Sequence, residues 1–65
     1  MKDYQQRVID EKAELDERRE KLNSFFGGSI YSGLDHDEQS RLQLQGSLMK
    51  MLSDVLEQRI CAFSE

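Results

Sequence analysis

Apolar residues recur every seven positions in two stretches of this chain. In the first stretch, Val8, Leu15 and Leu22 lie seven residues apart, and charged residues fill most positions between them. A narrow stripe of this kind is typical of a helix that packs as in a coiled coil. Opposite charges four residues apart also favour a helix. These pairs are Asp3–Arg7, Arg7–Glu11, Lys12–Asp16, Glu14–Arg18 and Glu17–Lys21. The pattern predicts a helix over residues 3–26.

The second stretch carries a wider apolar stripe. Its heptad positions are Leu42, Met49, Leu56 and Phe63. Before it stands Asp35, with Glu38 three residues later, which is the spacing of a helix capping box. The absence of proline from the chain suits long unbroken helices. We therefore predict a second helix over residues 36–63.

The segment between the two helices, residues 27–34, holds three glycines. Gly27 stands where a left-handed residue would end the first helix. We expect Ile30 and Leu34 to fold back over the end of the helix pair. A connection this short joins antiparallel neighbours. The predicted fold class is thus all-α, with residues 1–65 forming a single antiparallel two-helix hairpin.

A hairpin of 65 residues buries only a modest core and is marginally stable alone. Small proteins compensate with disulfides, metals or oligomerisation. A single cysteine excludes a disulfide within the chain, and one Cys with one His cannot fill a tetrahedral metal site. The apolar residues of the second helix exceed what one hairpin can cover. We therefore predict a homo-oligomer, a dimer or larger, packed as a helical bundle.

Composition excludes several classes of function. A net charge of -4 argues against a partner made of DNA or RNA. There is no apolar run near the roughly 18 residues of a membrane span, so we expect no membrane partner. A single thiol without a secretory signal fits a reducing cytoplasm. The only imidazole, His36, and the only thiol, Cys61, lie far apart in sequence. We expect no enzyme activity, no cofactor and no metal, and we expect Cys61 to be at least half-buried.

Polar residues interrupt both predicted seams. Glu11 and Arg18 do so in the first helix, and Gln45 and Arg59 in the second. One interpretation is that they set the register of a helical bundle. The other is that a pocket between subunits binds an anionic ligand and is lined by Arg7, Arg18, Gln45 and Arg59, since the planar guanidinium donates hydrogen bonds in pairs to phosphate or carboxylate. In that case Glu11 would orient the side chain of Arg59. The candidate ligand-binding residues are Tyr4, Arg7, Glu11, Gln45 and Arg59.

Four stretches of the chain resemble a family of small phage-encoded helical-hairpin proteins related to an uncharacterised protein of crAss-like phages. These stretches are "QRVIDEKAELDER", "KLNSFF", "LDHDEQSRLQLQGSLMKML" and "VLEQRICAF". The resemblance implies a phage accessory protein that acts in the cytoplasm of a bacterial host. Our first hypothesis is a non-catalytic oligomer that counters host antiviral defence by sequestering a cyclic nucleotide signalling molecule between subunits. The alternative is a protein-binding module that masks a host or phage protein through a helix face.

Overall fold

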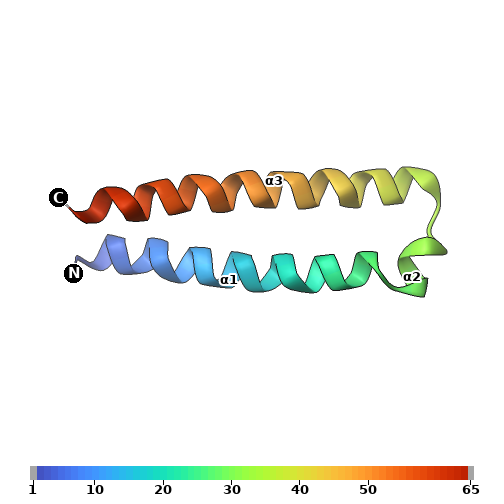
Figure 1. Cartoon of the computed structure of the whole chain (residues 1–65), viewed down its shortest axis with the longest axis horizontal. Helices are drawn as coiled ribbons and strands as arrows, with labels where there is room; N and C mark the ends of the chain where they lie inside the picture. The colour runs from blue at the N-terminus through green and yellow to red at the C-terminus, as the bar shows by residue number, and fades with distance from the viewer. Residues whose placement is uncertain (1, 65) are drawn as a thin grey trace.

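Two long antiparallel helices make up almost the whole molecule (Figure 1). The computed structural model describes residues 2–64, in which helix α1 spans Asp3–Phe26 and helix α3 spans His36–Cys61. A single turn, α2 (Ser29–Ser32), lies in the connection, and a 3-10 turn, η1 (Ala62–Ser64), follows α3. The rod measures 48 × 15 × 14 Å. The described residues contain no strand, so the predicted all-α class is confirmed, as is the packing of two helices side by side.

The start of α3 follows the cap that the sequence predicts. The Asp35 carboxylate accepts a hydrogen bond of 2.7 Å from the backbone N–H of Glu38. The Glu38 side chain does not complete a capping box; it accepts from Arg41 Nε at 2.8 Å. Three of the five predicted charge pairs on α1 also close as ion pairs, which are Lys12–Asp16, Glu14–Arg18 and Glu17–Lys21.

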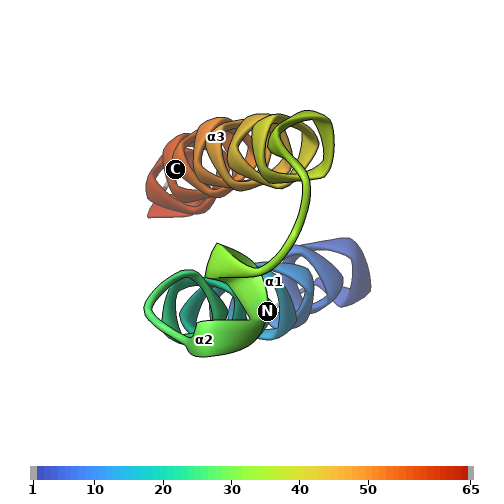
Figure 2. The same cartoon turned by 90° about the vertical axis from the view of Figure 1, so that its right-hand side faces the viewer.

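The prediction of a left-handed Gly27 is wrong. Gly27 has φ −84°, and no glycine of the described chain has a positive φ. The end of α1 continues in the right-handed sense, with Gly27 N–H bonded to Ser24 O at 3.2 Å and Gly28 N–H bonded to Phe25 O at 3.0 Å. These turns lead directly into α2, which lies beside the end of α1 in the view along the rod (Figure 2).

Tyr31 closes the loop end of the hairpin, in a role that we expected for Ile30 and Leu34. Leu34 is half-buried, but Ile30 is 69% exposed, so the prediction for Ile30 is wrong. The Tyr31 ring meets the Phe26 ring edge-on at 5.0 Å, and its hydroxyl accepts a hydrogen bond of 2.7 Å from Gln43 Nε2. A tyrosine suits this place because its ring can pack against apolar side chains while its hydroxyl stays in a polar environment.

The hydrophobic core is small and lies in the half of the hairpin near the chain termini. Its buried members are Val8, Leu15 and Leu56. The partly buried residues packed against them are Met49, Ile60 and Phe63. At the terminal end, the ring of Tyr4 meets that of Phe63 edge-on at 6.0 Å.

The register of the seam between α1 and α3 differs from our prediction. We placed Gln45 and Arg59, three residues beyond the heptad positions of α3, in the seam. The structure instead turns Gly46 and Ser53, four residues beyond, toward α1. Both spacings flank a heptad position, because 3.6 residues complete one turn. The smaller side chains lie inward, where they allow the helix backbones to approach.

The same shift applies to α1, where Lys12 and Arg19 are part-buried while Glu11 and Arg18 are exposed. Arg18 keeps 68% of its side chain exposed. Long basic side chains can lie along a seam with their charged ends in water. The heptad positions lie inward as predicted, and only the alternate seam positions are one residue later than predicted.

A polar cluster joins the two helices midway along the seam. The hydroxyl of Ser53, which is 3% exposed, donates to Asp16 Oδ1 at 2.7 Å. Lys12 Nζ donates to Asp16 Oδ2 at 2.6 Å, and Arg19 donates to Oδ1 at 3.0 Å. The hydrogen bond from Lys12, with that from Ser53, holds the pKa of Asp16 well below its ordinary value of 3.8. The same carboxylate raises the pKa of Lys12.

Candidate functional site

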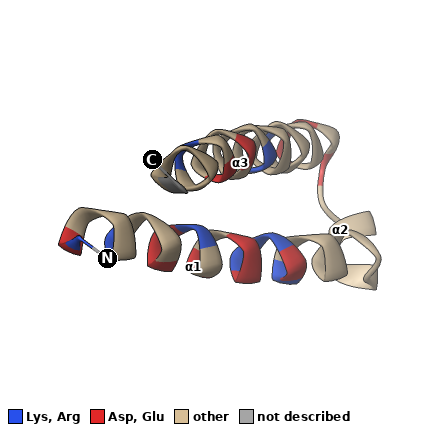
Figure 3. Cartoon of the chain, turned by 60° about the vertical axis from the view of Figure 1, so that its left-hand side comes forward, with Lys and Arg blue, Asp and Glu red and all other residues tan. Residues whose placement is uncertain are grey.

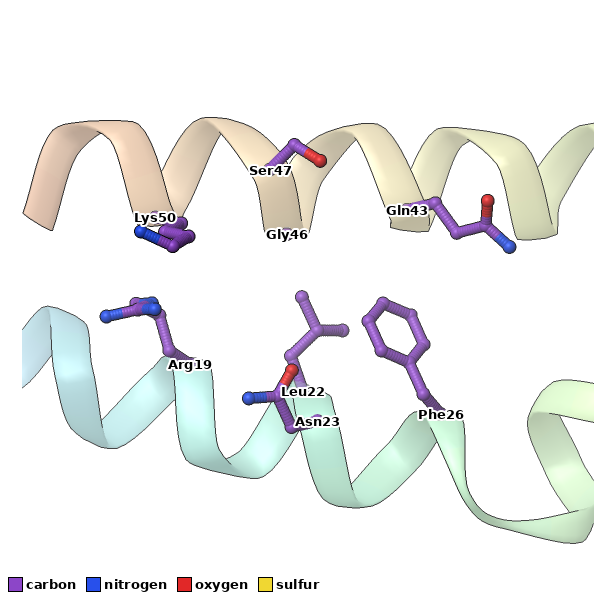
Figure 4. Close-up of a pocket in the computed structure, with 8 residues that line it drawn as sticks. All are labelled: Arg19, Leu22, Asn23, Phe26, Gln43, Gly46, Ser47 and Lys50. Carbon is purple, nitrogen blue, oxygen red and sulfur yellow. The ribbon is translucent and has the colours of Figure 1, made fainter.

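A groove opens between α1 and α3 in the half of the hairpin near the loop, beyond the hydrophobic core. Its volume is about 410 Å³. The residues that line it are Arg19, Leu22, Asn23, Phe26, Gln43, Gly46, Ser47 and Lys50 (Figure 4). We call it the cationic groove, because its lining contains two basic side chains and no carboxylate. On a chain with a net charge of -4, this lining stands out.

The two cations lie at one end of the cationic groove and approach each other from opposite helices (Figure 4). Arg19 comes from α1 and bonds to Asp16 at 3.0 Å, and Lys50 comes from α3 and bonds to Asp54 at 2.9 Å. Arg carries five N–H donors and Lys three, so both keep donors for a further acceptor. Such a pair can hold a phosphate or a carboxylate.

The other end of the cationic groove is more apolar. Phe26 and Leu22 rise from α1 toward Gly46 (Figure 4). A Cβ atom at Gly46 would lie 3.5 Å from Leu22 Cδ2 and 3.6 Å from Phe26 Cε2. Because glycine has no side chain, the floor of the groove stays low at this point.

Three uncharged polar side chains border the cationic groove. Asn23 and Ser47 form no side-chain hydrogen bond within residues 2–64. Gln43 donates through Nε2 to the Tyr31 hydroxyl at 2.7 Å, which fixes its amide and leaves its carbonyl oxygen to accept. The lining of the groove thus includes an amide, a hydroxyl and an oriented acceptor in addition to its two cations.

A second surface lies on α3, facing away from the core. Each of its apolar side chains is at least 44% exposed. They are Leu44, Leu48, Met51, Leu52 and Val55, which we call the outer face of α3. A shallow groove of about 370 Å³ runs along this face between Arg41 and Leu52. Figure 3 shows the contrast with α1, whose ribbon alternates between acidic and basic residues while most of α3 is neutral.

The ligand-binding residues predicted from the sequence are all exposed. They are Tyr4, Arg7, Glu11, Gln45 and Arg59. Within residues 2–64, Glu11 and Arg59 form no ion pair. Gln45 borders the groove on the outer face of α3, and Tyr4 contacts Phe63. One chain does not bring the five together, and their joint site stays a prediction about the assembled protein.

Sequence reasoning missed the cationic groove because it assigned the wrong register to the seam. Arg19 lies one position after the predicted Arg18, and Gly46 one position after the predicted Gln45. One signal was visible, since a glycine inside a helix permits a close approach and needs a reason. A search for polar residues level with Gly46 on the facing helix would have found Asn23 and Arg19.

The remaining candidate groups stay apart. Cys61 is exposed, which corrects the expectation that it is at least half-buried, and its Sγ lies 3.9 Å from Glu57 Oε1. His36 begins α3 at the loop end, whereas Cys61 ends it. Among residues 2–64 no three His, Cys, Asp or Glu side chains are grouped to hold a metal ion. None of the helices in that range is both long and apolar enough to cross a membrane.

Comparison with protein families links the chain to a group of relatives. Residues 2–62 match the model of the family described as Sequestin. The chain belongs to the Sequestin family. The match covers α1, α2 and α3 in full, so both the cationic groove and the outer face of α3 lie inside the Sequestin region. No match was found among curated proteins or among solved structures.

Proposed function

We propose that this Sequestin member is a non-catalytic phage protein that sequesters a cyclic nucleotide of host antiviral signalling in the bacterial cytoplasm. The family name suggests sequestration of a molecule, which is stoichiometric binding without turnover. The observation that carries the proposal is the cationic groove, a binding-sized hollow with two basic side chains on an acidic chain. Cavities of this volume are typical of small-molecule sites.

The proposal includes a homo-oligomer formed through the outer face of α3. Only Val8, Leu15 and Leu56 form the buried apolar core of the described chain, which is little for an independent fold. A symmetric contact between two copies covers the same exposed face on both. Fully burying one leucine contributes about 1.5–3 kcal/mol. Several such residues on each copy would supply the stability that the small core lacks.

Isothermal titration tests the proposed function. The ligands are cyclic dinucleotides, cyclic trinucleotides and cyclic ADP-ribose isomers, each titrated into the intact protein. We expect saturable binding of at least one of them, and chromatography should recover that ligand unchanged after incubation. Absence of binding across the whole panel would contradict the proposal, and conversion of the ligand would show an enzyme instead.

The outer face of α3 favours a second candidate function, the masking of another protein. Leu44, Leu48 and Leu52 follow the spacing of a helix that docks into a partner's groove. This function predicts a defined protein partner in lysate of infected cells and no nucleotide binding. A pull-down with the intact chain, compared with its Leu48→Lys variant, separates the two functions. Masking would be favoured if the intact chain captures a defined protein, the Leu48→Lys variant does not, and the nucleotide titration shows no binding.

A further inference from the structure

The cationic groove has two chemically different ends, and they suggest one kind of ligand. Arg19 and Phe26 are seven residues apart on α1, which is about 10 Å along a helix. The cations lie at the first end, and the Phe26 ring with the low floor at Gly46 lies at the second (Figure 4). A fitting ligand therefore has an anionic group at one end and a flat group at the other.

The first end suits a phosphate better than a carboxylate. Arg19 and Lys50 come from opposite sides, so they can contact different oxygens of the same tetrahedral group. Arg contributes a planar fork and Lys a compact point charge. Asp16 and Asp54 hold the two basic side chains and are not part of the lining.

The second end suits a nucleobase. Aromatic side chains bind bases through their faces and edges, and every base has a flat face to offer. Both Asn23 and Gln43 belong to the lining of the groove, and Gln43 lies nearest to Phe26 (Figure 4). The Gln43 carbonyl can accept from the polar edge of a base beside Phe26, and the Asn23 amide can both donate to and accept from other polar atoms of the ligand.

We infer that each chain binds a nucleotide within its own cationic groove, with the phosphate between Arg19 and Lys50 and the base beside Phe26 over Gly46. This inference rests on the proposed function and gives it a site and a stoichiometry. It differs from a site between subunits at Arg7, Glu11 and Arg59, because the groove is complete in one chain. It therefore predicts one nucleotide moiety per chain, whatever the size of the oligomer.

Titrations of the intact protein with AMP, adenosine and inorganic phosphate test the two ends separately. We expect AMP to bind at least about tenfold more tightly than either fragment, because it occupies both ends. Amide NMR locates the site, since Gly46 is the one glycine within a long helix. The Gly46 amide and the side-chain amides of Asn23 and Gln43 should shift as AMP is added. Shifts confined to Tyr4, Arg7 and Arg59 would overturn the inference.

Charge-neutral variants give a matched comparison. Lys50→Gln removes a cation of the groove. Lys21→Gln removes a cation that lies outside the groove and, like Lys50, pairs with a carboxylate four residues away. We expect Lys50→Gln to weaken AMP binding about tenfold or more, and Lys21→Gln to change it by less than about twofold. Equal effects of the two variants would show attraction by net charge alone and would overturn the inference.

Arg59→Gln distinguishes failure of the site from failure of the function. If Arg59→Gln abolishes binding of a cyclic nucleotide while Lys50→Gln does not, the cationic groove is the wrong site and sequestration stands. If AMP binds in the groove but no cyclic nucleotide binds, the site stands and the proposed messenger is wrong. Circular dichroism of each variant confirms that the hairpin is folded before its binding is compared.

Discussion

The face of α3 that points away from α1 is more hydrophobic than the face that packs against α1, which is the reverse of the usual arrangement. The inner face, turned toward α1, contains Gly46 and Ser53 beside the buried Leu56. The outer face, which includes Leu48 and Leu52, is more uniformly apolar and yet exposed. Large exposed apolar surfaces on small proteins mark interaction sites. The strongest hydrophobic surface of this chain is thus left available to a partner.

The inner face of α3 has small residues, and its main contribution is to fix the register between α1 and α3. The hydrogen bond between Ser53 and Asp16 fixes which turn of α3 packs against which turn of α1. A buried polar contact of this kind disfavours slipped alignments, which would leave the hydroxyl unpaired. The inner face therefore determines which residues of the hairpin meet, while the outer face offers more surface for stabilisation.

The largest expected effect is on the inner face, at Leu56. This side chain is 1% exposed, so Leu56→Ala leaves a cavity that the seam cannot fill. We expect a loss of about 2–5 kcal/mol in the free energy of unfolding, which is most of the stability of a chain this small. Urea unfolding followed by circular dichroism measures it. The control is Leu44→Ala on the outer face; a larger loss for that variant would reverse our assignment of the two faces.

The next largest effect concerns the outer face itself. Leu52→Lys places a charge where a second copy is expected to pack, and it removes the burial of a leucine, worth about 1.5–3 kcal/mol per chain. We expect the oligomer to dissociate and the dissociated chain to lose much of its helix signal. Gel filtration and circular dichroism at matched concentrations report both changes. Unchanged elution together with an unchanged melting temperature would show that this face does not hold the copies together.

A smaller effect, with a dependence on pH, is expected at the polar cluster. The pKa of Asp16 is lower in the folded chain than its ordinary value of 3.8, so the ionised carboxylate stabilises the fold above that pH. This contribution is lost as the pH falls from about 4 toward the folded pKa. Ser53→Ala should cost about 1 kcal/mol at neutral pH and reduce the acid loss.

Chemical unfolding of both proteins between pH 2 and pH 7, in steps of about one unit, measures this difference. The two stability curves should converge as the pH falls. Parallel curves over the whole range would mean that Ser53 does not stabilise the charge on Asp16.

The smallest expected change in stability has the opposite sign. Gly46→Ala adds a methyl group at ordinary contact distance from Leu22, 3.5 Å, and removes a glycine from a helix interior. We expect a gain of up to about 1 kcal/mol in the free energy of unfolding. The same methyl raises the floor of the cationic groove, so nucleotide affinity should fall. Thermal melts and AMP titration of the same sample check both, and a stabilised variant that binds AMP more tightly would contradict the proposed site.

Much of the fold follows from local rules that can be applied to the sequence. The heptads from Val8 and Leu42 predict two helices, and Asp35 caps the second as its position suggests. The handedness at Gly27 could not be read, because glycine permits either sign of φ and the choice depends on the short helix that follows.

The candidate site was harder to predict than the fold. Residues three and four positions beyond a heptad position lie on opposite sides of it, so periodicity alone leaves the choice between Gln45 and Gly46 open. Packing decides it, since Gly46 lies next to Leu22 and Phe26 and Ser53 bonds to Asp16 across the seam. The prediction that Gln45 and Arg59 lie in the seam was wrong for this reason.

Sedimentation equilibrium of the unmodified chain at micromolar concentrations tests most directly the claim that the outer face of α3 is reserved for a second copy. This measurement of the molecular mass requires neither a ligand nor a variant. The account predicts at least twice the chain mass of 7.6 kDa, with full helical content. A stably folded monomer of 7.6 kDa at those concentrations would contradict it.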